Sequence, residues 1–342
     1  MKEINRLVRE NIIRLKAYSS ARDEFNGTEG IFMDANENPF GTLNRYPDPY
    51  QRELKANISM IKGISEKNIF LGNGSDEVID LSFRIFCTPG INKVLIFPPT
   101  YGMYEIAAAI NDIEVIRIPL KGNFQIDLRK VESLFPDENI KLLFICSPNN
   151  PTGNCMNHKD ILFILENFRG IVVLDEAYID FSRKFSFVKM VDRFPNLIVL
   201  QTFSKAMGLA AARIGMAFTS PDIIHFLNKL KPPYNISTIN QMAARNKIVM
   251  VEEYNEIVRL IEKERERLAS RLKKVRITEI VYPSDANFLL VKFRDADIVY
   301  KILIDNGIIV RNRSSAIPGC LRITVGTSKE NDRLIETLEG IK

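Results

Sequence analysis

Tryptophan is absent from this chain of 342 residues, and histidine and cysteine are scarce. The two histidines, His158 and His225, have no metal ligand or nucleophile at a suitable spacing, which argues against a zinc site and against a histidine-based catalytic triad. The cysteines lack Cys-x-x-Cys spacing, as is typical of reduced, mostly buried thiols in a cytosolic protein. They are Cys87, Cys146, Cys155 and Cys320. We therefore expect no bound metal.

Long apolar runs are also missing, and no segment approaches the roughly 18 apolar residues of a membrane span. Charged residues occupy the N-terminus, Met1-Lys2-Glu3-Ile4-Asn5-Arg6, where a signal peptide needs an apolar core. The charged fraction of 26% and the mean hydropathy of −0.06 are typical of a soluble globular protein. The net charge is +5, and Lys and Arg are interleaved with Asp and Glu. We expect a cytoplasmic protein that binds neither membrane nor nucleic acid.

Helical and strand patterns alternate from about residue 47 to about residue 240, in a chain long enough for about two domains. Apolar segments predict strands of a mostly parallel sheet covered on both faces. These strands are expected over residues 93–97, 114–118, 141–146, 171–174, 197–202 and 215–219. Helices are expected over residues 50–62, 75–86 and 101–110. The fold class predicted from this alternation is α/β.

The two ends of the chain have different patterns. Residues 1–45 contain many turn formers, such as Asn36-Glu37-Asn38-Pro39-Phe40-Gly41, and predict a segment that wraps a larger body. One long amphipathic helix over residues 242–274 is expected to lead into a smaller α+β unit. Its strands are expected over residues 276–281, 287–293, 308–311 and 321–325. We predict an N-terminal segment (1–45), a large domain (46–245) and a small domain (246–342) that begins with the long helix.

A lysine stands in the turn Thr202-Phe203-Ser204-Lys205, directly after the strand expected over residues 197–202. A lysine becomes nucleophilic when burial or a nearby positive charge destabilises its ammonium, and such a turn can hold it so. Asp175-Glu176-Ala177-Tyr178 follows the preceding strand, with Asp175 30 positions before Lys205. Ligands of such sheets bind beyond the carboxyl ends of the strands. The pattern predicts a lysine that holds an aldehyde cofactor.

Gly72-Asn73-Gly74-Ser75-Asp76-Glu77 supplies glycines for a close backbone approach and then opens a helix. The N-H groups and positive dipole end of that helix suit a phosphate, and Arg213 offers a bidentate clamp for it. A plain helix N-cap by Ser75 explains the same residues and is favoured on this motif alone, and a surface ion pair is the alternative interpretation of Arg213. Both interpretations of each feature stay open on these residues alone.

The polar motifs, taken in order, resemble those of the class I/II aminotransferases, pyridoxal-phosphate enzymes of fold type I. The resemblance extends over nearly the whole chain and rests on Asn150-Pro151-Thr152-Gly153, Asp175-Glu176-Ala177-Tyr178, Ser204-Lys205 and Arg213. It implies a mostly parallel seven-stranded sheet between helices in the large domain, plus a smaller α+β domain. The N-terminal segment would pack with the small domain and over the site.

Within this superfamily, further motifs are similar to those of the histidinol-phosphate aminotransferase family. They are Tyr18-Ser19-Ser20-Ala21-Arg22, Asp34-Ala35-Asn36-Glu37-Asn38-Pro39, Asn44-Arg45-Tyr46-Pro47, Pro98-Pro99-Thr100-Tyr101-Gly102-Met103-Tyr104 and Leu321-Arg322-Ile323-Thr324-Val325-Gly326-Thr327. The resemblance implies interconversion of histidinol phosphate and 2-oxoglutarate with imidazole acetol phosphate and glutamate, a step of histidine biosynthesis.

The resemblance also implies which residues bind pyridoxal 5'-phosphate. Lys205 would bond covalently to the aldehyde of the cofactor and then move a proton between the substrate carbon and the cofactor's C4' atom. Asp175 would pair with the protonated pyridine nitrogen. Tyr178 and Asn150 would hydrogen-bond the phenolic oxygen of the ring, and Tyr101 would stack on its face.

The phosphate of the cofactor would be held by several groups at once. They are the backbone N-H groups of Ser75 and Asp76, the hydroxyl of Ser204, the guanidinium of Arg213, and Tyr46 from the neighbouring subunit. The role of Tyr46 implies a homodimer. Two positions depart from the family pattern: Gln201 stands where an arginine often precedes the turn, and Ala211-Ala212 replace a glycine-containing pair.

Substrate recognition is implied for residues at both ends of the chain. Arg322 would take the carboxylate of glutamate, and Arg322 with Arg311 and Tyr18 would take the phosphate of histidinol phosphate. Asn36 is a further residue of the N-terminal segment expected at the substrate. Arg313 has no assignable role and is interpreted as a surface residue.

Three other functions remain as alternatives. Two are enzymes of the same fold, an aminotransferase for aromatic amino acids and a phosphothreonine decarboxylase. The third is a non-catalytic aminotransferase-like module of a transcription regulator. It would need a DNA-binding domain ahead of the fold, whereas the motifs here begin by Tyr18. The presence of both Lys205 and Asp175 also favours an enzyme.

Overall fold

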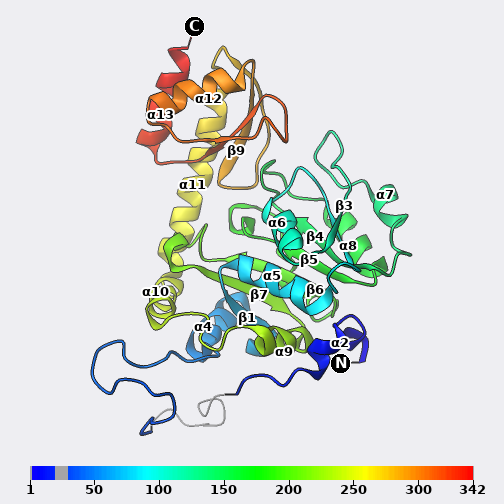
Figure 1. Cartoon of the computed structure of the whole chain (residues 1–342). Helices are drawn as coiled ribbons and strands as arrows, with labels where there is room; N and C mark the ends of the chain where they lie inside the picture. Colours follow the sequence, from blue (N-terminus) through cyan, green and yellow to red (C-terminus); the bar gives the residue numbers. More distant parts are fainter. Residues whose placement is uncertain (1, 20–29, 342) are drawn as a thin grey trace.

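A seven-stranded sheet forms the centre of the computed structural model, which describes residues 2–19 and 30–341 (Figure 1). Its strands are β1 (Ile69–Asn73), β2 (Lys93–Ile96), β3 (Glu114–Arg117), β4 (Ile140–Cys146), β5 (Ile171–Asp175), β6 (Leu197–Thr202) and β7 (Ile214–Thr219), in the order β1-β7-β6-β5-β4-β2-β3. Strand β7 is antiparallel to both β1 and β6, and the other neighbours are parallel. The predicted α/β fold with a mostly parallel sheet is confirmed.

The central strands are buried on both faces, which explains their continuous apolar sequences. Alternate residues of β5 enter different cores: Val172 and Leu174 face one cluster, Ile171 and Val173 the other. Helices α4 (Arg52–Lys62), α8 (His158–Asn167) and α10 (Thr238–Ile248) contribute to the first cluster. Helices α5 (Ser75–Phe86), α6 (Met103–Ile110) and α9 (Pro221–Leu230) contribute to the second.

A second, antiparallel sheet has the order β10-β11-β9-β8. Its strands are β8 (Thr278–Val281), β9 (Phe288–Phe293), β10 (Arg311–Asn312) and β11 (Cys320–Thr324). Helices α11 (Val251–Leu272), α12 (Ala296–Asp305) and α13 (Ser328–Glu339) pack on one face through a separate apolar cluster. Figure 1 shows this unit at the far end of α11 from the large sheet. The short remaining helices are α1 (Lys2–Asn5), α2 (Glu10–Arg14) and α7 (Leu128–Glu132), with 3₁₀ turns at Glu66–Asn68, Ile179–Phe181, Phe187–Met190 and Ala210–Ala212.

The single long helix expected over residues 242–274 is wrong. Two helices, α10 and α11, occupy this region, and Met250 between them has non-helical dihedral angles of φ −86 and ψ 56. The two helices serve different cores, because Ile248 of α10 is buried in the large-domain cluster and Leu268 of α11 in the small-domain cluster. β-branched residues at Ile248 and Val249 also weaken the helix at this point.

Two strand predictions also need correction. Strand β1 was not expected, because its sequence is short and runs into the glycines of Gly72-Asn73-Gly74. The strand expected over residues 308–311 is Arg311–Asn312 in the structure. Both are edge strands that pair antiparallel: β1 pairs with β7, which is distant in sequence, and β10 pairs with the next strand, β11. The local sequence pattern does not predict the pairing of β1 with so distant a strand.

The N-terminal residues pack at the end of the large sheet. Ile4, Val8 and Ile12 are buried in the cluster that includes α5 and α9. After the gap in the described residues, the chain loops out from the body before α4 (Figure 1). Several apolar side chains of this loop are exposed to solvent: Ile31 is 93%, Met33 89% and Phe40 81% exposed. The predicted domain limits at 45 and 245 stay a prediction.

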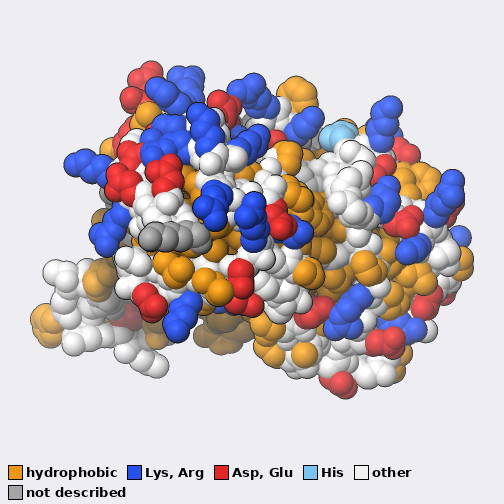
Figure 2. Space-filling model, turned by 90° about the horizontal axis from the view of Figure 1, so that it is seen from above, with side chains coloured by type: hydrophobic (Ala, Val, Ile, Leu, Met, Phe, Trp, Pro, Cys, Tyr) orange, Lys and Arg blue, Asp and Glu red, His pale blue; other side chains and the backbone are white. Residues whose placement is uncertain are grey.

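Charged side chains of both signs are interspersed on the face shown in Figure 2. Within residues 2–19 and 30–341, no helix is long and apolar enough to cross a membrane.

Candidate active site

A small cavity of about 100 Å³ lies where the polar motifs leave the large sheet. Strands β4 and β5 pair so that Cys146 lies beside Asp175, and β5 and β6 pair so that Asp175 lies beside Leu200. The carboxyl ends of these parallel strands therefore meet at one edge. The lining residues are Gly74, Ser75, Asp76, Tyr101, Cys146, Asn150, Asp175, Ala177, Tyr178, Thr202, Ser204, Lys205 and Arg213.

The turn between β1 and α5 reaches this cavity because two positions lack a side chain. Gly74 has φ +79, a conformation that other residues rarely adopt. Gly215 lies so close that a Cβ atom there would be 2.2 Å from the backbone nitrogen of Ser75. Gly74 is the N-cap of α5, without a side-chain cap, and Ser75 is the first helical residue. The interpretation of Ser75 as a plain N-cap is therefore wrong, and the start of α5 faces the cavity.

Asp175 is the buried acid of the cavity, with 3% of its surface exposed. Its Oδ2 atom accepts a 2.7 Å hydrogen bond from the hydroxyl of Tyr104, and its Oδ1 atom accepts a 3.1 Å bond from the backbone N-H of Ala177. Burial raises the pKa of Asp175 above its ordinary value, while these two bonds oppose the rise. A cation that enters the cavity would stabilise the ionised carboxylate.

Lys205 lies opposite this acid, and its Nζ atom is 5.5 Å from the ring centre of Tyr178. Burial, and after it the charge of Arg322, lower the pKa of Lys205. The charges of Asp175 and Asp76 oppose that shift. The neutral amine is the nucleophilic form, so this environment increases its share at a given pH.

Arg213 and Tyr101 converge on Asp76 at the cavity wall. The Nη2 atom of Arg213 is 3.6 Å from Oδ2 of Asp76, and the Tyr101 hydroxyl donates a 3.1 Å hydrogen bond to Oδ1. The side chain of Arg213 is 48% exposed, so the long ion pair contributes little to stability. Arg213 and Asp76 are thus paired at the cavity wall, and the guanidinium of Arg213 remains accessible to a ligand.

Arg322 joins the small sheet to this cavity. Its Nη1 atom donates a 2.6 Å hydrogen bond to Oδ1 of Asn150, and its guanidinium lies 5.4 Å from the ring centre of Phe288. Asn150 is also hydrogen-bonded to Tyr178, whose pKa is raised chiefly by burial. Arg322 on β11 therefore connects the small sheet to Asn150, a residue of the cavity wall.

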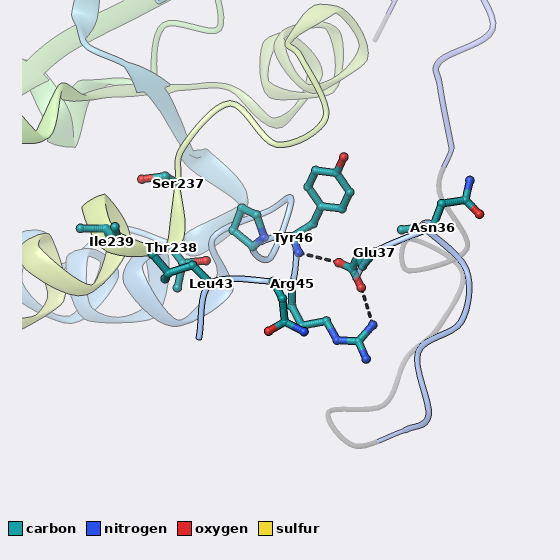
Figure 3. A pocket seen from close by; sticks show the side chains of 11 residues that line it. Asn36, Glu37, Leu43, Arg45, Tyr46, Ser237, Thr238 and Ile239 are labelled. Atoms are coloured by element: carbon teal, nitrogen blue, oxygen red, sulfur yellow. Dashed lines mark hydrogen bonds and ion pairs between the residues drawn. The ribbon is translucent and has the colours of Figure 1, made fainter. Parts of the chain in front are cut away.

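Five of the predicted residues do not line this cavity in the same chain, among them Arg322, which contacts its lining residue Asn150. Tyr18 is 71% exposed, and Arg311 is exposed on β10 directly opposite Arg322. Asn36 and Tyr46 line a different cavity of about 370 Å³, formed by the N-terminal loop and the start of α10 (Figure 3). Ser20, Ala21 and Arg22 of the first motif lie outside the described residues.

The N-terminal loop is held together locally, as Figure 3 shows. Glu37 accepts a 2.6 Å hydrogen bond from the backbone N-H of Tyr46 and a 2.7 Å bond from Nη1 of Arg45. The ring of Tyr46 stacks on that of Tyr234, with ring centres 4.4 Å apart. Tyr46 thus has a defined position at the surface of its own chain, 50% exposed.

Sequence reasoning missed several residues at the site. Tyr104 belongs to a quoted motif but was assigned no role; it lies in the first turn of α6, and its ring is edge to face with that of Tyr101 just before the helix, at 5.5 Å between ring centres. Thr202 accepts a 3.1 Å hydrogen bond from the backbone N-H of Ser204 and so shapes the lysine turn. The interpretation of Arg313 as a surface residue is wrong: it is half-buried, and its Nε atom is buried without a hydrogen-bond partner.

Comparison with known proteins identifies the family. Residues 21–338 match the model of the family "Aminotransferase class I and II", and the chain belongs to this family. It is 50% identical to a histidinol-phosphate aminotransferase of Cytophaga hutchinsonii, over 98% of each chain. It is 51% identical to one of Parabacteroides distasonis, over 100% of each chain. The crystal structure of the histidinol-phosphate aminotransferase from Clostridium acetobutylicum is similar with a TM-score of 0.81 and 27% identity, over 87% of this chain and 91% of that chain.

Proposed function

We propose that this chain is a pyridoxal-phosphate-dependent histidinol-phosphate aminotransferase. It exchanges an amino group between histidinol phosphate and 2-oxoglutarate, giving imidazole acetol phosphate and glutamate, a step of histidine biosynthesis. The proposal rests on the comparison with relatives named for this activity. About half of all residues are identical to theirs over nearly the whole length of the chain. The grouping of Lys205, Asp175 and Arg213 around one cavity supports it independently.

The residues of the cavity fit pyridoxal phosphate. When bound, this cofactor supplies a cationic ring that withdraws electrons from the substrate carbon. Asp175 is a buried carboxylate that makes no ion pair with any described residue, and it would hold the proton on the ring nitrogen. Tyr178 and Asn150, already hydrogen-bonded to each other, would hold the phenolic oxygen, and Tyr101 would lie against the ring face.

Lys205 has two tasks in this proposal. Its neutral amine, favoured by burial and by Arg322, would hold the cofactor through its aldehyde carbon. When a substrate amine takes that place, the amine of Lys205 would act as the base that moves the proton of the substrate carbon. Lys205 lies in a turn fixed by the hydrogen bond from the backbone N-H of Ser204 to the hydroxyl of Thr202, which would restrict where its amine can reach.

The phosphate of the cofactor has a natural place at the start of α5. The backbone N-H groups of Ser75 and Asp76 begin that helix, whose dipole favours an anion. Ser204 and Arg213 line the same cavity and would add a hydroxyl and a guanidinium. An incoming phosphate would compete with Asp76 for Arg213, whose present ion pair is long at 3.6 Å.

Tyr46 would complete this phosphate site from a second copy of the chain, which makes the enzyme a homodimer. In its own chain Tyr46 lines a different cavity from Lys205. The loop that carries it exposes Ile31, Met33 and Phe40, an apolar surface of the kind that a second copy would cover. The N-terminal segment would then pack over the site of the partner, with Asn36 and Tyr18 near its substrate.

The two substrates would share one anion site. Arg322 lies next to Asn150 at the cavity and would bind the carboxylate of glutamate. Arg311, its partner across the β10–β11 pair, would join it in binding the phosphate of histidinol phosphate. An aromatic aminotransferase of the same fold would have no substrate phosphate for the second arginine to bind. A phosphothreonine decarboxylase would bind a phosphorylated amino acid, so the choice against it rests on the identity to histidinol-phosphate aminotransferases.

The test is an assay of amino transfer to 2-oxoglutarate with the purified holoenzyme. Histidinol phosphate, histidinol, phenylalanine, tyrosine and phosphothreonine are offered at equal concentration, and glutamate and carbon dioxide are both measured. We expect kcat/KM to be highest for histidinol phosphate. A preference for phenylalanine or tyrosine, or release of carbon dioxide from phosphothreonine, would overturn the substrate assignment and leave the cofactor chemistry intact.

A further inference from the structure

Arg313 continues the pairing between β10 and β11. Arg311 lies opposite Arg322, Asn312 opposite Leu321, and the backbone N-H of Arg313 donates a 2.9 Å hydrogen bond to the carbonyl of Cys320. Because side chains alternate along a strand and paired residues share a face, Arg311, Arg313 and Arg322 belong to the same face of this sheet.

That face is the one turned toward the large domain. Arg322 bonds Asn150 from it. Cys320, directly opposite Arg313, lies in an apolar cluster with Leu290 and Ile317, against which Phe124 of the large domain packs. Arg313 is therefore on the side of the small sheet where the cavity of Lys205 lies, and it is half-buried there.

The three arginines have no acidic counterpart. Within residues 2–19 and 30–341, no ion pair joins any of them to a carboxylate. Burial lowers the pKa of Arg313, and the charges of Arg322 and Arg311 lower it further, with no acid opposing the shift. Three neighbouring guanidinium groups without an acid repel one another, and an anion with more than one charge is the ligand that would relieve this repulsion.

Two buried polar atoms in the same turn also indicate a binding site for a polar ligand. The Nε atom of Arg313 and the hydroxyl of Ser314 are both buried, and neither has a hydrogen-bond partner among the described residues. Buried polar groups are normally paired, so two unpaired ones at consecutive positions require an explanation. The backbone here is fixed, because the carbonyl of Arg313 accepts hydrogen bonds from Ala316 and Ile317 at 2.9 and 2.8 Å.

We propose that Arg313 is a third arginine of the substrate anion site and favours a doubly charged phosphate over a singly charged carboxylate. The inference rests on the proposed function, since it concerns the site in which both substrates would bind. Arg322 binds both anions. Arg313 adds a further positive charge, which binds a doubly charged phosphate more strongly than a singly charged carboxylate. It is a specificity-determining residue that touches the phosphate, with no part in proton transfer.

The experiment compares Arg313→Gln with the parent holoenzyme. Glutamine keeps a polar side chain of similar reach and removes the charge. Arg276→Gln is the matched control, because Arg276 is an exposed arginine just before β8. For histidinol phosphate we expect Arg313→Gln to raise KM roughly tenfold or more, the loss of one charge-assisted contact, with kcat nearly unchanged. The glutamate half-reaction and the Arg276→Gln control should change by less than about threefold.

A pH series separates this role from a structural one. The second ionisation of a phosphate monoester has a pKa of about 6, so kcat/KM of the parent for histidinol phosphate should fall as pH drops below that value. Without Arg313 the enzyme distinguishes less between the dianion and the monoanion of the substrate phosphate. The decrease of kcat/KM at low pH should therefore be smaller in Arg313→Gln than in the parent. Equal losses in both half-reactions, a loss confined to kcat, or an unchanged KM for histidinol phosphate would each overturn the proposal.

Inorganic phosphate provides a test that does not depend on the substrate assignment. It should compete with glutamate in the parent, and its inhibition constant should rise roughly tenfold in Arg313→Gln but not in Arg276→Gln. If the parent does not transaminate histidinol phosphate, the proposed function fails, while this competition still decides the role of Arg313. Equal inhibition of parent and Arg313→Gln by phosphate would contradict the proposed role of Arg313.

Discussion

The hydroxyl of Tyr104 donates a 2.7 Å hydrogen bond to Oδ2 of Asp175, and both side chains are buried. Tyr104 extends from α6 beneath Tyr101, with the two rings edge to face at 5.5 Å. This bond lowers the pKa of Asp175 against the opposing effect of burial. Tyr104 therefore helps to keep the carboxylate ionised for the ring nitrogen that it is proposed to bind.

We predict that Tyr104→Phe raises the pKa of Asp175 further and lowers kcat. Hydrogen bonds to charged groups contribute about 1.5 to 3 kcal/mol, so the loss should be roughly tenfold to a hundredfold. Because the acid is then ionised only at higher pH, the acidic limb of the kcat profile should shift upward. The control is Tyr300→Phe, at a half-buried tyrosine in the small-domain core. An unshifted acidic limb would show that Tyr104 serves packing alone.

Lys205→Ala should abolish covalent attachment of the cofactor and leave the fold intact. Since proton transfer by a positioned base contributes about 10² to 10⁴ in rate, at least that much activity should be lost. Borohydride reduction followed by mass spectrometry of the peptide carrying residue 205 reads the attachment directly, with Lys62→Ala as the control. A variant that still fixed the cofactor at another lysine and turned over normally would refute the assignment.

The order of motifs along the sequence was enough to predict this part of the site. Lys205 and Asp175 each follow a buried strand, and the rule that ligands meet the carboxyl ends of parallel strands brings them together. The bond from Tyr104 could not be predicted in the same way, because it depends on how α6 packs against β5. Arg313 was misplaced for a similar reason: its face is set by the pairing of β10 with β11, across a turn that local patterns do not specify.

The break between α10 and α11 shows the same limit. One helix was expected over residues 242–274, yet the chain leaves helical geometry at Met250; Ile248 before the break is buried in the large-domain core, and Leu268 near the end of α11 is buried in the small-domain core. Periodicity indicates that a segment has an apolar side and does not specify which core that side meets.

Tyr46 and Lys205 allow a direct test of the shared site. If each active site combines Lys205 of one chain with Tyr46 of the other, Tyr46→Ala weakens cofactor binding and Lys205→Ala removes catalysis. Unfolding and refolding a mixture of the two variants should then restore activity at limiting cofactor. One site in each mixed dimer is complete, so about a quarter of the parental activity is expected from random pairing. Sites confined to one chain would give only the sum of the separate variants.

Glu176 predicts a pH dependence of stability. It is fully buried, and the donors to its carboxylate among the described residues are all neutral: the hydroxyl of Ser186, the backbone N-H of Phe187 at 2.7 Å and Nε2 of Gln201 at 3.0 Å. Burial raises the pKa of Glu176 to about 7 from an ordinary value of 4.5. Between these values the folded state binds more protons than the unfolded state, so this group lowers the free energy of unfolding as pH rises.

The decline should begin near pH 4.5, end near pH 7 and amount to on the order of 3 kcal/mol. In Glu176→Gln this contribution disappears, and the unpaired Oε1 atom of Gln201 can accept the new amide hydrogen after a flip of its side chain. Urea unfolding of both proteins from pH 4.5 to pH 8 measures the difference. The variant should gain relative stability as pH rises, and parallel profiles would contradict the shifted pKa.

Arg322 and Arg311 face each other across β10 and β11. A fixed guanidinium can bind a carboxylate in one half-reaction and a phosphate in the other, because both anions present paired oxygens at similar spacing. Losing one such contact costs about 1.5 to 3 kcal/mol, or about one to two decades in kcat/KM. Arg322→Lys should weaken both half-reactions, because lysine cannot form the fork that also bonds Asn150. Arg311→Ala should weaken chiefly the reaction of histidinol phosphate and leave that of histidinol nearly unchanged. Equal effects of Arg311→Ala on both amines would show that Arg311 acts on the fold of the small domain and does not contact the phosphate.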